Sequence, residues 1–183
     1  MPDALLGLAP SRIRFCALLF AISLLPLQSP GSDTALPQPV SLPPLESTAV
    51  VLTVSTDHGS KRYSLPQIEA LGLYRVTTST FWPEDNGTYE GVLLAALLAD
   101  AGLADGPAVR IAALDDFSQI IPREDWQRWP LLLATRRDGQ PMSIRNKGPL
   151  RLIYPRDADS RLSDPAYRLR WVWMVNAIEP VAP

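Results

Sequence analysis

Cysteine and histidine are nearly absent from this sequence of 183 residues, which contains one of each, Cys16 and His58. These numbers exclude an internal disulfide, a cysteine and histidine zinc cluster, and any Ser-His-Asp site that does not use His58. His58 stands in the turn-forming stretch Asp57–Gly59, where we expect an exposed turn residue. The sequence therefore predicts no catalytic residue and no metal ligand.

An excess of positive charge is also absent, because 17 Lys and Arg face 19 Asp and Glu, for a formal net charge of -2. Nucleic-acid-binding domains normally gather basic residues on one face, so no nucleic-acid partner is expected. Hydrophobic residues make up 46% of the chain, which is enough for the core of one ordinary domain.

Residues 1–31 have the organisation of a secretory signal peptide. Two arginines precede an apolar run of 13 residues, 15–27, which is too short to cross roughly 30 Å of hydrocarbon. Small residues near the Gly31–Ser32 bond suit cleavage, and a retained anchor or a buried helix is the alternative. Cleavage would remove Cys16 and leave 15 basic and 18 acidic residues of the original 17 and 19. We expect a periplasmic or secreted protein without a membrane contact after cleavage.

Proline is concentrated just after this signal, with four prolines in residues 32–47. Each proline fixes φ and removes a backbone donor, so this stretch is predicted to be an extended linker without helix or sheet pairing. The folded domain is then expected to comprise residues 48–183.

Two or three short helices are predicted in this domain. Ser64 and Gln67 form a capping box at the start of a helix over 65–71. Apolar residues at helical spacing after Gly91 predict a second helix that ends at Gly102. A short helical turn is expected over 122–126.

Strands account for most of the remaining domain. The Asp138-Gly139 pair predicts a two-residue hairpin turn. The fold class is therefore α+β, mostly β with two or three short helices packed on the strands. Runs rich in β-branched, aromatic and apolar residues predict strands over 50–54, 74–80, 109–114, 117–121, 131–135, 140–143, 150–154 and 168–175.

Five short motifs follow one another in a characteristic order. They are Tyr89-Glu90-Gly91-Val92, Ala113-Leu114-Asp115-Asp116-Phe117, Leu133-Ala134 with Asp138-Gly139-Gln140-Pro141-Met142, Gly148-Pro149-Leu150-Arg151-Leu152 with Tyr154-Pro155, and Trp171. With these motifs the sequence resembles the oxidoreductase molybdopterin-binding domain, the central domain of sulfite oxidases and nitrate reductases and of their bacterial periplasmic relatives. It looks closest to a small, single-domain exported subgroup. The resemblance implies a sulfite-oxidase-type fold and makes molybdopterin a candidate cofactor.

The metal ligand of that family has no counterpart in this sequence. In the family's enzymes a cysteine after the first short helix ligates molybdenum through its thiolate. The matching stretch here is 74–82, and Thr78 matches the cysteine. A threonine hydroxyl is a hard and weak donor, whereas molybdenum in these enzymes takes a soft anionic sulfur. The resemblance therefore implies the fold and disfavours catalysis.

Five residues are candidates for binding a cofactor or another ligand. The family's enzymes hold the pterin phosphate with basic and polar groups, and the matching cluster contains Arg145, Lys147 and Arg151. The alternative is a solvated loop before a strand. Trp82 lies close to the metal position and is expected to face either a pocket or the core. Thr78 completes the set.

Three functions remain open. The favoured hypothesis is a non-catalytic exported module without a resident cofactor, which binds a small anionic or flat ligand or a periplasmic protein partner through the loops around Trp82 and Lys147. The first alternative is a periplasmic molybdopterin-dependent oxidoreductase with a non-cysteine metal site. The second alternative is a pure protein-interaction module.

Overall fold

A computed structural model describes residues 35–181 of the chain, so the predicted signal peptide and Cys16 lie outside the described residues. Within that range, no helix combines the length and the apolar character needed to cross a membrane.

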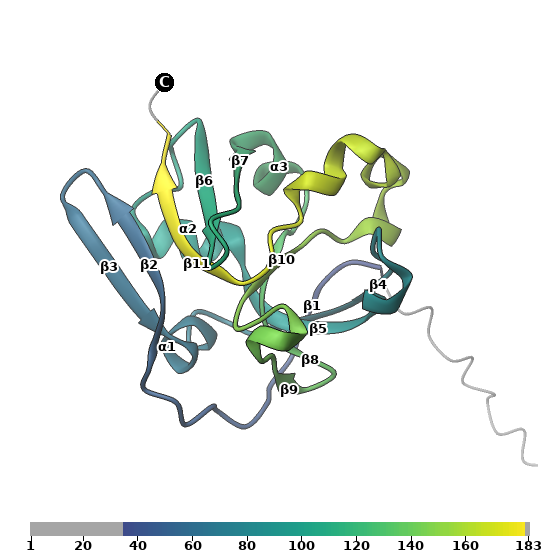
Figure 1. The fold of residues 1–183 in the computed structure, drawn as a ribbon, viewed down its shortest axis with the longest axis horizontal. Coiled ribbons are helices and arrows are strands. Elements are labelled where there is room, and N and C mark those ends of the chain that lie inside the picture. The colour runs from purple at the N-terminus through teal and green to yellow at the C-terminus, as the bar shows by residue number, and fades with distance from the viewer. Residues whose placement is uncertain (1–34, 182–183) are drawn as a thin grey trace, which may run out of the picture. The chain divides into compact units, whose positions relative to one another are not determined.

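One of the two sheets contains six strands, all paired antiparallel, in the order β1-β4-β5-β8-β10, with β9 pairing β8 (Figure 1). The turn between β8 and β9 is the predicted Asp138-Gly139 hairpin, where both residues have positive φ values of 51° and 77°. The strands are β1 (Gln38–Pro39), β4 (Tyr74–Thr78), β5 (Gly87–Leu93), β8 (Leu132–Arg137), β9 (Gln140–Pro141) and β10 (Arg151–Ile153).

The other sheet has five strands in the order β3-β2-β11-β6-β7 and lies to the left in Figure 1. Its only parallel pair within the described residues is β11 with β2. In β2, Leu52 and Val54 point to the same face and are fully buried, as the alternation of a half-buried strand requires. The strands are β2 (Val50–Thr56), β3 (Gly59–Ser64), β6 (Ala108–Ala113), β7 (Ser118–Pro122) and β11 (Val175–Pro180).

Three short α-helices pack on these strands, which confirms the predicted α+β class. At the start of α1 (Leu65–Glu69) the Ser64 amide donates to Gln67 Oε1 at 2.8 Å, within the predicted capping box. Helix α2 (Leu94–Ala101) ends at Gly102, whose left-handed φ of 79° suits glycine. Helix α3 runs over Arg123–Arg128. Five 3-10 segments complete the fold: η1 (Pro83–Asp85), η2 (Ile144–Asn146), η3 (Arg156–Ala158), η4 (Ser160–Ser163) and η5 (Pro165–Arg170).

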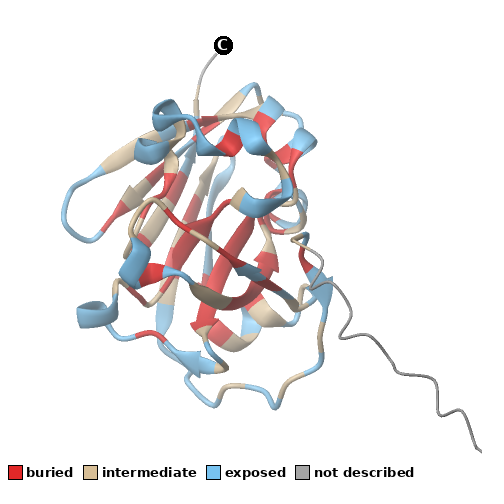
Figure 2. Cartoon of the chain, turned by 90° about the vertical axis from the view of Figure 1, so that its right-hand side faces the viewer, coloured by how far each residue is buried: buried red, intermediate tan, exposed pale blue. Residues whose placement is uncertain are grey.

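A single hydrophobic cluster contains side chains from both sheets and all three α-helices. Figure 2 shows the buried residues following the strands through the interior, while turns and 3-10 segments are mostly exposed. Close approach of backbones contributes to this packing: a Cβ on Gly91 of β5 would lie 2.2 Å from the carbonyl oxygen of Leu133 in β8. Only glycine fits at that position.

The prediction of a last strand over 168–175 is wrong. Residues 165–170 form η5, and the strand β11 begins only at Val175. Met174 has a positive φ of 51°, which is incompatible with an extended strand and ends any pairing before Val175. The alternating tryptophans at 171 and 173 therefore mark an irregular segment. Strands β3 and β5 were not predicted.

Residues 35–47 of the proline-rich stretch contain no helix, as expected, but the expectation that the stretch forms no ladder is wrong at Gln38 and Pro39. These two residues pair with Arg75 and Tyr74 at the edge of the first sheet. Proline is tolerated in an edge strand because the backbone N–H groups on the outer side of that strand have no neighbouring strand to which they could donate. Farther on, the carbonyl of Pro43 accepts a hydrogen bond from Arg136 at 2.7 Å.

Candidate functional site

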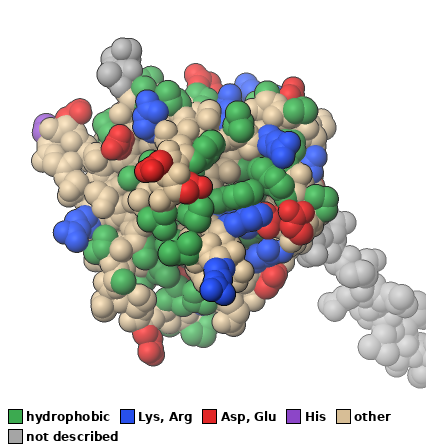
Figure 3. All heavy atoms as spheres, in the orientation of Figure 1, with side chains coloured by type: hydrophobic (Ala, Val, Ile, Leu, Met, Phe, Trp, Pro, Cys, Tyr) green, Lys and Arg blue, Asp and Glu red, His purple; other side chains and the backbone are tan. Residues whose placement is uncertain are grey.

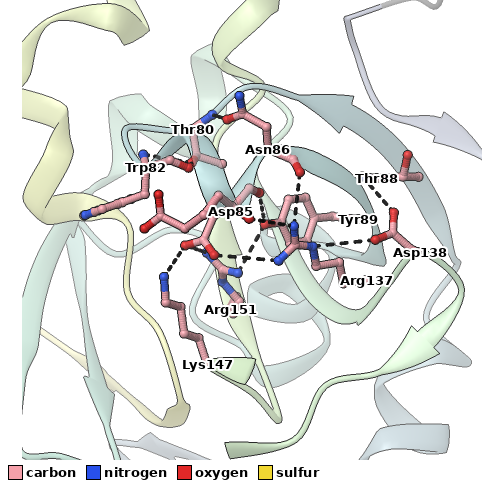
Figure 4. Close-up of polar contacts among 11 residues, drawn as sticks. Thr80, Trp82, Asp85, Asn86, Thr88, Tyr89, Arg137, Asp138, Lys147 and Arg151 are labelled. Atoms are coloured by element: carbon pink, nitrogen blue, oxygen red, sulfur yellow. Dashed lines mark hydrogen bonds and ion pairs between the residues drawn. The ribbon is translucent and has the colours of Figure 1, made fainter. Parts of the chain in front are cut away.

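The carboxylate of Asp85 lies at the centre of a cluster of three cations (Figure 4). Lys147 Nζ donates to Asp85 Oδ2, and Arg151 Nη2 donates to the same oxygen at 3.1 Å. Arg137 Nη1 lies 3.7 Å from Asp85 Oδ1. Asp85 and Arg151 are buried, at 6% and 0% exposure, whereas Lys147 and Arg137 are 26% and 28% exposed, so the cluster is partly open to solvent.

The loop that carries Asp85 is held by its own hydrogen bonds. It runs from the end of β4 through η1 to β5, and Thr80 and Asn86 close it. The Thr80 amide donates to Asn86 Oδ1 at 2.7 Å, and the Thr80 hydroxyl donates to the carbonyl of Trp82 at 2.6 Å. Tyr89 then donates its hydroxyl to the carbonyl of Asp85. These bonds present Trp82 and Asp85 in a defined orientation.

Lys147 reaches the cluster from a second loop, just after η2. It has a left-handed φ of 65°, and its carbonyl accepts a hydrogen bond from the Met174 amide at 3.0 Å. The neighbouring Gly148 passes so close to Met142 that a Cβ on Gly148 would lie 2.2 Å from the Met142 carbonyl oxygen. The first contact joins this loop to the irregular segment before β11, and the second packs it against the chain that follows β9.

Arg151 and Arg137 come from β10 and from the end of β8. Arg151 is completely buried, and its Nη1 lies 3.1 Å from the Tyr89 hydroxyl oxygen. Burial raises the pKa of the Tyr89 phenol, although the positive charges of Arg151 and Arg137 oppose that shift. Tyr89 therefore stays a neutral hydroxyl that can both donate and accept.

Aromatic rings enclose the cluster. Trp82 and Trp173 contact each other edge to face, with ring centroids 4.6 Å apart. Lys147 Nζ lies 3.9 Å from the centroid of Trp173 and 5.9 Å from that of Trp82. This is the geometry of a cation–π contact, and it links the charged cluster to the tryptophan pair.

The same two tryptophans line a surface hollow of about 220 Å³. In Figure 3, hydrophobic side chains gather in the middle of the face shown, with basic and acidic side chains beside them. The hollow combines a mainly aromatic wall with one cation and one carboxylate. Its lining residues are Trp82, Asp115, Phe117, Arg168, Leu169, Trp171 and Trp173.

Three of the five predicted site residues come together in this region. Trp82 lines the hollow and its ring centroid lies 5.9 Å from Lys147 Nζ, and Lys147 and Arg151 belong to the cluster. Thr78 lies elsewhere: it is 2% exposed at the end of β4, and its hydroxyl is within 3.2 Å of the Ser79 carbonyl oxygen and 3.4 Å of the Asp157 amide nitrogen. Arg145 is exposed and has no ion pair with any residue between 35 and 181.

Sequence analysis missed Asp85, Tyr89, Arg137 and Arg168 as site residues and favoured no binding role for Trp173. Asp85 stands in a Pro-Glu-Asp-Asn-Gly stretch that reads as an ordinary turn. It contacts Lys147 across a separation of 62 residues, so no local pattern connects the two. The one feature of the sequence that could have indicated Asp85 is its position three residues after Trp82, in the same loop.

Over residues 35–181, no group of three or more His, Cys, Asp or Glu side chains is arranged to hold a metal ion. A family model described as the oxidoreductase molybdopterin binding domain matches residues 62–161, more than half of the chain. This match includes Thr78, the Asp85 cluster and the first four predicted motifs, and it confirms the resemblance. No curated protein matches the chain.

Proposed function

The chain belongs to the oxidoreductase molybdopterin-binding domain family, and from this premise we propose that it binds a small, flat, anionic ligand without catalysing a molybdenum-dependent reaction. The fold is the sulfite-oxidase type, and family membership makes molybdopterin a candidate cofactor. The residues of this chain depart from the family's pattern in two places.

The residues present do not fit a molybdenum site of the family's kind. Thr78, which matches the ligating cysteine, offers a hard hydroxyl where a soft thiolate is required. That hydroxyl is buried and close to the Ser79 carbonyl and the Asp157 amide. Two of the basic side chains expected to meet a pterin phosphate, Lys147 and Arg151, are paired with Asp85 instead.

The aromatic hollow is the observation that carries the proposal. Trp82, Trp171 and Trp173 line a space of about 220 Å³, below the range of about 300–1,000 Å³ typical of pockets for drug-sized ligands. A single or fused planar ring is the matching size. Trp171 is held in place by stacking on Tyr154, with ring centroids 6.0 Å apart, so the wall is largely preformed.

Arg168 supports an anionic ligand. Its guanidinium carbon lies 5.3 Å from the centroid of Trp82, and it lines the hollow. Arg168 has no ion pair with any of the residues 35–181, whereas Lys147 is engaged by Asp85. An exposed guanidinium over an aromatic wall suits a carboxylate or sulfonate attached to a flat ring.

A fluorescence titration with pterin-6-carboxylate as a flat anionic probe tests this proposal. Binding is expected to change tryptophan emission. Arg168→Gln is expected to weaken binding about 5- to 15-fold, which corresponds to about 1–1.5 kcal/mol, the upper part of the range for an ordinary hydrogen bond, because Arg168 is exposed to solvent. Arg62→Gln removes an exposed arginine on β3, away from the residues of the hollow, and serves as the matched control. Equal affinities of the two variants would contradict the role of Arg168.

Elemental and mass analysis of the protein isolated from its natural source tests whether the chain lacks a molybdenum cofactor, as the proposal requires. Stoichiometric molybdenum with a bound pterin would overturn the proposal and favour the oxidoreductase. We also propose that the protein is exported. The mass of the isolated protein tests this, because cleavage of the signal peptide predicts a mature chain that begins near Ser32. A chain that retains residues 1–31 would contradict cleavage.

Docking of a periplasmic protein partner is the second candidate function. The observation that favours it is the apolar rim of the hollow, where Phe117 is 39% and Leu169 is 62% exposed. A partner that inserts an apolar side chain would depend on Leu169 and not on Arg168. Pull-down from a periplasmic extract with Leu169→Ser and Arg168→Gln variants distinguishes the two functions: loss only with Leu169→Ser supports docking, and equal recovery with both variants contradicts it.

A further inference from the structure

The cation cluster around Asp85 has the composition of an anion-binding site. Arg151 is completely buried, and a buried guanidinium requires a compensating anion, because an unpaired charge in the interior is strongly destabilising. Lys147 and Arg137 approach the same point from two other segments. The structure therefore needs an anion here, and Asp85 supplies it.

A single carboxylate does not satisfy this cluster. Asp85 presents two oxygens to three cations, and among the described residues the buried Nε of Arg151 has no hydrogen-bond partner, whereas Arg137 Nε lies 3.6 Å from a second carboxylate oxygen, Asp138 Oδ2. Buried donors are normally paired, so Asp85 leaves at least one buried donor of Arg151 without an acceptor. A tetrahedral oxyanion has four oxygens and matches such a set of lysine and arginine donors better than a carboxylate does.

We propose that Asp85 is an intramolecular occupant of an oxyanion site formed by Arg151, Lys147 and Arg137, and that it excludes external phosphate-type groups from this site. Asp85 is thus a specificity-determining residue. The inference concerns the cluster and not the neighbouring hollow, so it does not rest on ligand binding in the hollow.

Removal of the Asp85 carboxylate tests the proposal. In chloride, Asp85→Ala is expected to have a lower Tm than the unaltered protein. Replacing chloride with inorganic phosphate at equal ionic strength is expected to raise the Tm of Asp85→Ala by about 3–6 °C and that of the unaltered protein by less than about 1 °C. Calorimetric titration with phosphate should show binding to the variant alone.

Two controls separate this effect from a general salt effect. Asp105→Ala makes the same change in net charge at a carboxylate that is 99% exposed, and it should respond to phosphate no more than the unaltered protein does. The double variant Asp85→Ala/Lys147→Gln should lose most of the phosphate response. An equal response of Asp85→Ala and Asp105→Ala, or a phosphate response that survives Lys147→Gln unchanged, would overturn the proposal.

A variant that does not fold in chloride still gives a result. The proposal then predicts that Asp85→Ala refolds in phosphate and that the near-isosteric Asp85→Asn folds in both salts with a higher Tm in phosphate. An Asp85→Ala protein that stays unfolded in both salts, together with an Asp85→Asn protein indifferent to phosphate, contradicts the proposal.

Discussion

The ammonium group of Lys147 lies 3.9 Å from the centroid of the Trp173 indole and donates a hydrogen bond to Asp85 at the same time. One side chain thereby links three segments that are far apart in the sequence: the loop with Asp85, the loop after η2 and the irregular segment before β11. The tryptophan wall of the hollow and the ionic cluster consequently depend on each other.

Replacement of Lys147 by methionine should destabilise the protein by about 1.5–3 kcal/mol, because it removes a charge-assisted hydrogen bond and a cation–π contact near a buried carboxylate. Urea unfolding followed by tryptophan emission measures the change. Lys61→Met is the control: Lys61 is 46% exposed and pairs with Asp100, so its loss should cost less than about 1 kcal/mol. Similar losses in both variants would show that Lys147 contributes no more than an exposed lysine.

Gly91→Ala should destabilise the fold by about 3 kcal/mol or more, because the new Cβ would lie 2.2 Å from the Leu133 carbonyl oxygen and 2.6 Å from Ala134 Cα in the adjacent strand. Gly87→Ala in the same strand meets only the flexible end of Arg137, at 3.3 Å, and should change stability by less than about 1 kcal/mol. Thermal unfolding of both variants measures the difference. A Gly91→Ala protein as stable as Gly87→Ala would mean that β5 and β8 are farther apart than described.

The buried pair of Arg136 and Glu69 should behave as a unit. Arg136 Nη2 lies 2.6 Å from Glu69 Oε2, and the two side chains are 6% and 8% exposed. Glu69→Leu leaves a buried guanidinium without its anion and should cost about 3–5 kcal/mol, whereas Glu69→Leu with Arg136→Met should cost much less than the sum of the two single changes. A double-mutant cycle in urea measures the coupling, and additive losses would contradict it.

Alkaline pH should destabilise the protein through Tyr154. Burial, followed by the nearby Asp125 carboxylate, raises the pKa of the Tyr154 phenol well above its ordinary value of about 10. The unfolded state then releases this proton first, so the free energy of unfolding is unaffected below about pH 10 and falls as the pH rises above it. Each such tyrosine contributes up to about 1.4 kcal/mol per pH unit.

Denaturation at several pH values checks this prediction. Tyr154→Phe removes the titrating group together with its 2.7 Å hydrogen bond to Asp125, so it should lower stability at neutral pH and flatten the alkaline slope. An unchanged slope in Tyr154→Phe would assign the alkaline effect to other tyrosines, such as Tyr89.

Much of the local structure could be predicted from short-range signals. The capping box at Ser64, the helix stop at Gly102 and the Asp138-Gly139 turn are all present, because each depends on residues a few positions apart. The last strand could not be predicted correctly. Its alternating tryptophans resemble a strand, but the left-handed backbone at Met174 and the contacts of Trp173 come from packing against distant loops.

The candidate site was predictable only in part. Trp82, Lys147 and Arg151 were identified through a family resemblance, which predicted that Lys147 and Arg151 bind an external anion or belong to a solvated loop. The structure shows Lys147 and Arg151 paired with Asp85, which lies more than 60 residues away from both along the chain. Sequence alone assigned Asp85 to a turn, and only the position of that turn between the two loops makes it a counter-ion.

The sequence by itself determined the family, the fold class and the absence of a thiolate at the family's metal position, because residue types and short motifs specify these directly. Only the tertiary structure decided which of the charged side chains form ion pairs and which stay unpaired among the described residues. Coulombic and hydrogen-bond energies depend on distances between side chains, and those distances exist only after β5, β8 and β10 have assembled. The assembled strands place Asp85 among Lys147, Arg151 and Arg137 and leave Arg168 beside the aromatic hollow.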